Sequence, residues 1–252
     1  GFFTLPFDEK YGGMNSILSA CIAIEEFGRI CYNTAYLLVV QWVPFGAILA
    51  GGSKNQKDRY LPGLADGSLR GAFSTTESQS GSDVGGITTR AVKVDGGYRI
   101  TGNKIWCTNS SVADFVVVAA RLEGMTGKRA INFFIVDRKS MGFSIGPPEN
   151  KMGARGVPSC PLYFDNVFVN EDAMLGQPGE GFGIVMEAFN ISRPIIGARG
   201  VGLSQGALDH ALLFVKERRA FGEQVVDFQG VRWMLADMHV QIEAARNLVY
   251  KA

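Results

Sequence analysis

Apolar residues recur at helical spacing in the first part of the chain. Residues 14–50 carry two successive apolar runs of this kind, which predict a helical segment. Gly51-Gly52-Ser53 stops the second run, because glycine and serine favour helix ends and turns. Residues 55–61 then show the pattern of a short amphipathic helix, which Pro62 is expected to halt.

The period changes to the alternation typical of β-strands in the middle of the chain. Residues 91–94 and 98–101 flank Asp95-Gly96-Gly97, which is a strong signal for a β-hairpin. Further β-rich runs, separated by turn residues, cover 115–120, 131–136 and 162–169. Several strands within about a hundred residues predict a compact antiparallel barrel or sandwich.

Helical spacing returns after Gly181. One apolar stripe covers residues 195–215, Phe221-Gly222 breaks it, and a second stripe covers 231–250. The expected fold class is therefore α+β with several domains. We expect a helical domain over residues 1–70, a β domain over 71–178 and a second helical domain over 179–252.

Composition narrows the classes of function. The 25 basic and 24 acidic residues nearly balance, which argues against a nucleic-acid footprint and against a basic membrane-binding face. No uninterrupted apolar stretch reaches the roughly 18 residues of a membrane span. The four cysteines lack metal-ligand spacing and are expected to be free thiols in a reducing compartment. Two histidines are too few for a histidine-based metal site.

Two short polar clusters carry the candidate chemistry. Residues 76–83 read Thr-Glu-Ser-Gln-Ser-Gly-Ser-Asp, and residues 105–109 read Ile-Trp-Cys-Thr-Asn. Taken singly, the hydroxyls could satisfy strand ends and turns, and Trp106 could be a core aromatic. Together the clusters offer an aromatic face for an isoalloxazine ring, hydroxyls for its edge and a small-residue loop for a diphosphate. They therefore point to a flavin.

This ordering and its flanks resemble the acyl-CoA dehydrogenase family. The matching motifs cover essentially the whole chain and include Gln56-Lys57-x-x-Tyr60-Leu61-Pro62, Gly102-x-Lys104-x-Trp106, Lys151-Met152-Gly153-x-Arg155, Gly179-x-Gly181 and Arg218-x-x-Phe221-Gly222. The resemblance implies an N-terminal helical domain, a middle antiparallel β-barrel domain, a C-terminal helical bundle and FAD as the cofactor. Because the family carries further helices on both sides, we expect an internal segment of a longer polypeptide, with a naturally short chain as the alternative.

The resemblance also implies which residues hold FAD. Trp106 would lie against the flavin ring, and Thr108 would hydrogen-bond near the hydride-accepting nitrogen. Thr76, with the backbone of Phe73 and Thr75, would hold the pyrimidine edge. Phe73 replaces a common tyrosine, a change that a backbone contact tolerates.

Substrate contacts are implied at the loop and on the following helix. Ser82 would contact both the diphosphate and the mouth of the acyl-CoA channel, and Asn190 and Arg193 would lie near the substrate. Asn190 stands where an acidic residue is frequent. Ser78 and Gln79 stand where the family has proline and a small residue, so this loop is expected to differ in shape.

Three residues near the C-terminus match positions that reach the FAD of a neighbouring subunit. These are Arg218, Phe221 and Gln229. A solvated helix end for Arg218 and an interhelical plug for Phe221 are the alternatives. Because a cofactor shared in this way needs two chains, we expect a dimer or a homotetramer built as a dimer of dimers.

The implied reaction belongs to fatty acid metabolism and lipid degradation. It is FAD-dependent α,β-dehydrogenation of an acyl-CoA thioester to a trans-2-enoyl-CoA, with electrons passed to an electron-transfer flavoprotein. A carboxylate must take the α-proton. Ser192 occupies the base position of a minority of members and cannot do this unaided. The base is therefore expected beyond Ala252 or is missing, and Glu187 is expected to be solvated or paired.

Two other functions fit the same residues. One is an oxygen-using acyl-CoA oxidase or flavin monooxygenase of this fold, and the other is a catalytically silent partner subunit of a hetero-oligomer. Trp42 and Phe45 either shorten the acyl pocket, which would favour short, branched or ring-bearing acyl groups, or are core aromatics. The expected location is the bacterial cytoplasm or the mitochondrial matrix.

Overall fold

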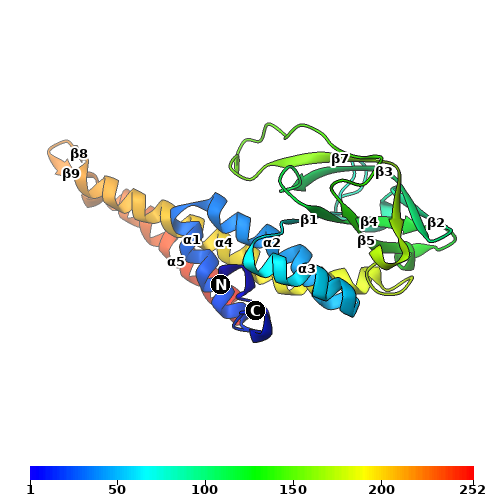
Figure 1. Ribbon diagram of the computed structural model, residues 1–252. Coiled ribbons are helices and arrows are strands. Elements are labelled where there is room, and N and C mark those ends of the chain that lie inside the picture. The colour runs from blue at the N-terminus through cyan, green and yellow to red at the C-terminus, as the bar shows by residue number, and fades with distance from the viewer.

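Residues 1–252 are described by a computed structural model, in which long helices extend away from a β domain (Figure 1). The N-terminal part contains the short 3-10 helices η1 (Phe2–Thr4) and η2 (Glu9–Tyr11) and the helices α1 (Ile17–Ile30), α2 (Tyr32–Gly51) and α3 (Lys54–Asp66). The helical pattern predicted for residues 14–50 is confirmed, and it corresponds to α1 and α2.

Helix α3 is longer than predicted. It begins with a capping box, in which Ser53 and Gln56 each bond the other's backbone N–H, at 3.2 and 2.7 Å. The prediction that Pro62 halts this helix was wrong, because the helix continues for another turn and ends at Gly67, whose φ is +83°. The capped start and the burial of Leu61 outweigh the one backbone hydrogen bond that Pro62 removes.

Helix α2 is apolar because it is a core helix. Its length and its mean hydropathy of 1.5 are those of a helix that could cross a membrane. However, polar residues interrupt its apolar sequence, and 56% of its most apolar stretch is buried inside the protein. The indole N–H of Trp42 donates to the carbonyl of Phe3 at 2.8 Å. Phe45 stacks on Phe7 with ring centroids 4.0 Å apart. Trp42 and Phe45 are therefore core aromatics.

The middle of the chain forms a seven-stranded sheet with the order β1-β4-β2-β3-β7-β6, and β5 pairs with β4. The strands are β1 (Gly71–Ser74), β2 (Arg90–Val94), β3 (Gly97–Thr108), β4 (Phe115–Leu122), β5 (Ile131–Asp137), β6 (Phe143–Ile145) and β7 (Ser159–Asn170). Three 3-10 helices, η3 (Val84–Gly86), η4 (Gly127–Ala130) and η5 (Glu171–Ala173), lie in the connections. The predicted hairpin and the three predicted strands are confirmed.

The pairing is mostly antiparallel, as predicted, but β4 is parallel to both β1 and β2. Parallel neighbours require a long crossover connection, which residues 75–114 provide between β1 and β4. Periodicity alone does not reveal this arrangement.

Strands β4 and β5 are buried on both faces. Alternate residues of β4, such as Val117 and Val118, belong to two different cores. One core lies between the sheet and the helices, and the other is the interior shared by β1 to β5 and β7. Burial on both sides explains why these strands are continuous apolar runs in the sequence.

Two long helices form the C-terminal part. They are α4 (Gly181–Glu217) and α5 (Gln229–Lys251), joined through β8 (Arg219–Ala220), β9 (Glu223–Gln224) and η6 (Val225–Asp227). Helices α1 and α4 pack closely, because a Cβ on Gly202 or Gly206 would lie 2.2 Å from the carbonyl oxygen of Glu25 or Arg29. Glu25 also accepts hydrogen bonds from Arg246 at 2.7 Å and from Tyr250 at 2.8 Å on α5. All four cysteines are free, as predicted.

Candidate functional site

The structure brings the two polar clusters side by side. The first follows β1, and the second forms the end of β3. The backbone N–H of Ile105 donates to the carbonyl of Thr76 at 3.0 Å, and the thiol of Cys107 contacts the carbonyl of Phe73 at 3.6 Å. Phe73, Thr75 and Thr76 therefore lie directly against the strand that carries Trp106 and Thr108.

Trp106 presents its indole to solvent. The β3–β7 register shifts between Lys104 and Cys107, which is the mark of a bulge, and Trp106 within it has a φ of +55°. Its side chain is 62% exposed, whereas Lys104 and Cys107 on either side are buried. Trp106 is thus not a core aromatic in this chain. Its exposed flat surface is suited to stacking against a planar ligand.

Thr108 lies at the end of β3 with its hydroxyl only weakly bonded. Its oxygen is 3.5 Å from the hydroxyl of Tyr36 on α2 and 3.3 Å from that of Ser159 on β7. Both distances exceed the usual range for O–H···O hydrogen bonds. The hydroxyl therefore keeps hydrogen-bonding capacity for a ligand. Tyr36 was not assigned to this hydroxyl cluster from the sequence, because helix α2 and strand β3 meet only in the fold.

A cavity of about 700 Å³ opens beside the first cluster. Thr75, the loop carrying Ser82, and the first turns of α4 with Phe189 and Arg193 line it. Ser82 is exposed at its wall, and Asn190, which does not line it, accepts a hydrogen bond from Arg193 at 2.7 Å. Of the three predicted substrate contacts, Ser82 and Arg193 thus border the cavity directly.

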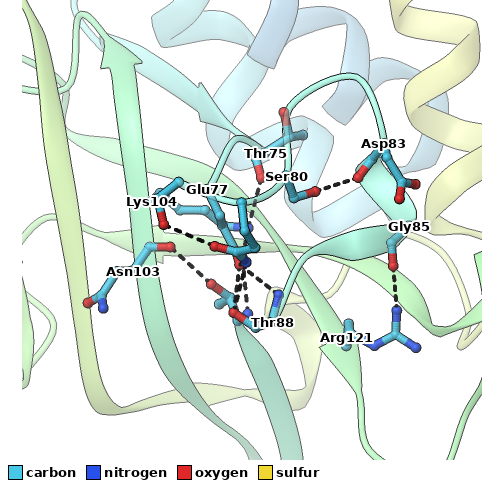
Figure 2. Close-up of polar contacts among 12 residues, drawn as sticks. Thr75, Glu77, Ser80, Asp83, Gly85, Thr88, Asn103, Lys104 and Arg121 are labelled. Carbon is cyan, nitrogen blue, oxygen red and sulfur yellow. Dashed lines mark hydrogen bonds and ion pairs between the residues drawn. The ribbon is translucent and has the colours of Figure 1, made fainter.

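The cavity carries an excess of positive charge. Arg121, Lys128 and Arg193 line it, and Asp83 is the one carboxylate among the lining residues. None of the three cations forms an ion pair. Arg121 donates instead to the carbonyl of Gly85 at 2.8 Å, which ties it to the loop (Figure 2). Sequence reasoning missed Arg121 and Lys128, because neither belongs to a polar cluster.

Glu77 of the first cluster forms a buried ion pair with Lys104, which directly precedes the second cluster. Nζ of Lys104 is 2.8 Å from Oε1 of Glu77 and 3.0 Å from the carbonyl oxygen of Thr75 (Figure 2). Burial alone would raise the pKa of Glu77, but hydrogen bonds from Lys104, Thr88 and Thr89 outweigh this effect and hold the pKa at about 2. Burial lowers the pKa of Lys104, and Glu77 opposes that change. The short contact between them is that of a charged pair.

The residues near the C-terminus lie elsewhere. Arg218, Phe221 and Gln229 are at or beside the turn between α4 and α5, at the end of the molecule farthest from the β domain (Figure 1). Phe221 is 97% exposed, so it does not plug an interhelical gap within this chain. The predicted cofactor residues thus form two separate groups in one chain.

Neither candidate base residue, Ser192 or Glu187, lines the cavity. The hydroxyl of Ser192 donates to the carbonyl of Phe189 one turn earlier on α4, at 3.1 Å. Glu187 is exposed on the same helix and forms no ion pair, so it is a solvated residue, as expected.

Three segments of the chain match domains of one protein family. Residues 1–68 match the N-terminal domain of acyl-CoA dehydrogenase, residues 72–167 match the middle domain, and residues 179–252 match the C-terminal domain. A relative from Clostridium acetobutylicum, the short-chain specific acyl-CoA dehydrogenase, is 39% identical over 100% of this chain and 67% of its own length.

Solved structures agree with the sequence relatives. Butyryl-CoA dehydrogenase from Megasphaera elsdenii is 36% identical with a TM-score of 0.95, over 100% of this chain and 67% of that one. The FAD complex of PigA is 26% identical with a TM-score of 0.95, over 100% of this chain and 67% of that one. The chain spans about two thirds of the length of these proteins. The predicted fold class and cofactor are confirmed, and the chain belongs to the acyl-CoA dehydrogenase family of FAD-dependent oxidoreductases.

Proposed function

We propose that the protein containing residues 1–252 oxidises an acyl-CoA thioester to a trans-2-enoyl-CoA and passes the electrons to an electron-transfer flavoprotein. One observation carries the proposal: the exposed Trp106 and the weakly bonded Thr108 lie on the strand end whose Lys104 contacts Thr75, and Thr75 lines a cavity with three unpaired cations. A planar cofactor and a phosphate-bearing substrate each find complementary chemistry there.

The residues around Trp106 fit FAD. The indole offers a face to the ring system, and the hydroxyl of Thr108 offers a donor and an acceptor. The peptide groups of Phe73, Thr75 and Thr76 line the adjoining strand end and are suited to the polar edge of a pyrimidine. Bound FAD supplies a two-electron acceptor for the hydride that leaves the β-carbon of the substrate.

The cavity fits the CoA part of the substrate. CoA carries several phosphate charges, and Arg121, Lys128 and Arg193 together supply three positive charges against the single carboxylate of Asp83. Phe182 and Phe189 provide apolar surface in the same lining, suited to the uncharged arm of CoA. Ser82 offers a hydroxyl at the edge of this cavity.

The α-proton requires a carboxylate base, and none of the lining residues of α4 supplies one. We place the base outside residues 1–252. If this is correct, the complete protein abstracts the proton with a residue whose removal abolishes turnover but leaves FAD binding intact. A catalytically silent partner subunit would lack such a residue.

Arg218, Phe221 and Gln229 are proposed to contact FAD held by a second copy of the chain. The turn between α4 and α5 lies at the end of the molecule farthest from the β domain, whose strand β3 carries Trp106 (Figure 1), and this position and the exposure of Phe221 support the assignment. A dimer or a dimer of dimers follows. Replacing Arg218 by alanine should lower the FAD content of the oligomer, whereas Lys216→Ala, exposed on the same helix end, should not.

The acyl group is proposed to be short, because the Clostridium relative is described as short-chain specific and a close structural relative is a butyryl-CoA dehydrogenase. Trp42 and Phe45 do not carry this proposal, since both are core residues. The proposed location is the cytoplasm of a bacterium or the mitochondrial matrix.

The test is turnover of a series of acyl-CoA thioesters by the purified complete protein. The proposal requires formation of the trans-2-enoyl product with an electron-transfer flavoprotein as acceptor. Stopped-flow mixing of the substrate-reduced protein with oxygen distinguishes a dehydrogenase from an acyl-CoA oxidase. Rapid reoxidation of the flavin with release of peroxide would identify an oxidase.

A further inference from the structure

We propose that Lys104 and Glu77 are positioning residues that fix the two halves of the flavin site relative to each other. This inference rests on the proposed function, because it concerns how the chain holds FAD. The pair itself contacts the backbone and side chains of the site and is not required to touch the cofactor (Figure 2).

The sheet leaves the two halves of the site without a shared ladder. β1 pairs only with β4, and β3 pairs with β2 and β7, so two strands separate β1 from β3 in the sheet order. The cluster after β1 and the cluster at the end of β3 nevertheless have to lie side by side to hold one ring system. Their relative position therefore comes from contacts outside the ladder, which are the backbone hydrogen bond from Ile105 to Thr76 at 3.0 Å, the contact of Cys107 with Phe73 at 3.6 Å, and the side-chain contacts of Lys104 and Glu77.

Lys104 supplies such a contact from the β3 side. Its side chain is fully buried, and its ammonium group donates to the carbonyl of Thr75 at 3.0 Å and to Glu77 at 2.8 Å. The carbonyl of Thr75 belongs to the backbone segment assigned to the pyrimidine edge. Lys104 lies two residues before Trp106, so one side chain joins the strand that carries the indole to the opposite edge of the site.

Glu77 supplies the matching contact from the β1 side. Its two carboxylate oxygens accept five hydrogen bonds: from Lys104, from the backbone N–H of Thr88 at 2.6 Å and of Thr89 at 3.0 Å, from the Thr88 hydroxyl at 2.8 Å, and from Gln79 at 2.6 Å. The donors come from its own loop, from the entry to β2 and from β3. The carboxylate thus joins three segments at one point (Figure 2).

The same anchor sets the start of the loop that carries Ser82. Backbone hydrogen bonds close a turn between Glu77 and Ser80, at 2.9 and 3.1 Å, and the Ser80 hydroxyl donates to the carbonyl of Asp83. Ser78 and Gln79 occupy this turn, and Gln79 bonds Glu77 directly. The unusual sequence of the loop is therefore part of the anchored unit.

The charge of the Lys104–Glu77 pair is better explained by a role in fixing geometry than by a gain in stability. A buried ion pair seldom adds net stability over apolar residues of similar volume, whereas removing one partner leaves an uncompensated buried charge. A device that fixes geometry through directional, charge-assisted bonds accounts for the pair better than stabilisation alone does.

The experiment compares Lys104→Met, Glu77→Gln, the double variant and Lys54→Met in the complete protein. Lys54 forms an exposed pair with Asp58 at 2.6 Å and is the matched control. Two quantities are measured: the dissociation constant of FAD from each apoprotein, and the visible absorption spectrum of each FAD-loaded protein. Both are compared with the thermal midpoint of the apoprotein, which reports folding alone.

We expect Lys104→Met to weaken FAD binding by about tenfold, the usual scale for loss of a charge-assisted hydrogen bond, and to shift the flavin bands. The double variant restores a charge-balanced interior, so its apoprotein should regain thermal stability while FAD affinity and the spectrum stay altered. If Lys104→Met fails to fold, the FAD affinity and the flavin spectrum of the double variant test the inference instead. Lys54→Met should match the wild type.

Two results would overturn the inference. One is an FAD affinity within twofold of the wild type with an unchanged spectrum in the double variant. The other is recovery of affinity in proportion to stability, which would make the pair structural only. Failure of the wild-type protein to bind FAD would instead contradict the proposed function, so the two failures are distinguishable.

Discussion

Nζ of Lys104 lies 2.8 Å from Oε1 of Glu77, and the two side chains are 0% and 3% exposed. The contact connects residues 27 positions apart in the chain. It lies behind a surface on which the exposed Trp106 and the half-buried Thr108 face away from the core. The buried ion pair and the exposed surface proposed to hold FAD thus belong to the same strand ends.

The depressed pKa of Glu77 predicts acid sensitivity. Its value is about 2 in the folded protein against an ordinary 4.5, because hydrogen bonds to the charged form outweigh burial. A lowered folded pKa gives stability that is complete above the ordinary value and is lost as the pH falls through the folded value. The contribution, about 3 kcal/mol from the difference of the two values, should therefore disappear between about pH 4.5 and pH 2.

Urea unfolding at a series of pH values measures this effect. The wild-type free energy of unfolding should decline across that window, and Glu77→Gln should show a flatter profile from a lower starting value. A variant profile parallel to that of the wild type would show that Glu77 does not titrate as described.

Replacing Trp106 by alanine should affect cofactor binding more than folding. The side chain is 62% exposed, so the free energy of unfolding of the apoprotein should change by less than about 0.5 kcal/mol. Loss of the aromatic face should weaken FAD binding by about tenfold, while Trp106→Phe should retain most of the affinity. Fluorescence titration of the apoproteins with FAD measures this. Equal affinity in the alanine variant would remove Trp106 from the site.

The unpaired cations of the cavity should act on substrate binding. Arg121→Ala and Lys128→Ala should each raise KM for an acyl-CoA by about fivefold with little change in kcat, since each removes one partly exposed ion pair with phosphate. Arg99→Ala, an exposed arginine outside the cavity lining, is the control. With an acyl-pantetheine thioester, which lacks the nucleotide phosphates, the variants should equal the wild type. A raised KM with that substrate too would contradict the assignment.

The close contact between α1 and α4 should make the protein sensitive to a larger residue at Gly202 on α4. A methyl group on Gly202 would lie 2.2 Å from the carbonyl oxygen of Glu25, whereas one on Gly200 would meet nothing within 4 Å. Gly202→Ala should lower the free energy of unfolding by roughly 3 kcal/mol, because backbone atoms must move. Gly200→Ala should leave it unchanged or raise it by up to about 1 kcal/mol through helix propensity. Calorimetry of both variants checks the difference, and equal midpoints would contradict the packing described.

Much of the fold is predictable from the sequence, because it depends on local patterns. The apolar stripes of α1, α2, α4 and α5 and the turn between β2 and β3 each lie within a short stretch of chain. The extension of α3 past Pro62 and the parallel pairing of β4 depend on burial and on chain connection, which local patterns do not contain.

The candidate site likewise contains some residues that the sequence identifies and others that only the fold brings together. Trp106 and Thr108 are found from their short motif, and the exposed indole of Trp106 and the weakly bonded hydroxyl of Thr108 agree with a ligand site. The Lys104–Glu77 contact and the charged cavity wall at Arg121 arise from residues far apart in the chain. The sequence places Glu77 in the first polar cluster and Lys104 two residues before Trp106, but only the fold brings them together.

The proposed dehydrogenation is measured by anaerobic titration of the FAD-loaded complete protein with acyl-CoA thioesters. We predict that at least one short acyl-CoA, added in stoichiometric amount, abolishes the visible absorption of the oxidised flavin, with the trans-2-enoyl-CoA as product. If a series of straight-chain and branched acyl-CoAs leaves the spectrum unchanged while a chemical reductant bleaches it, the proposed dehydrogenation is contradicted.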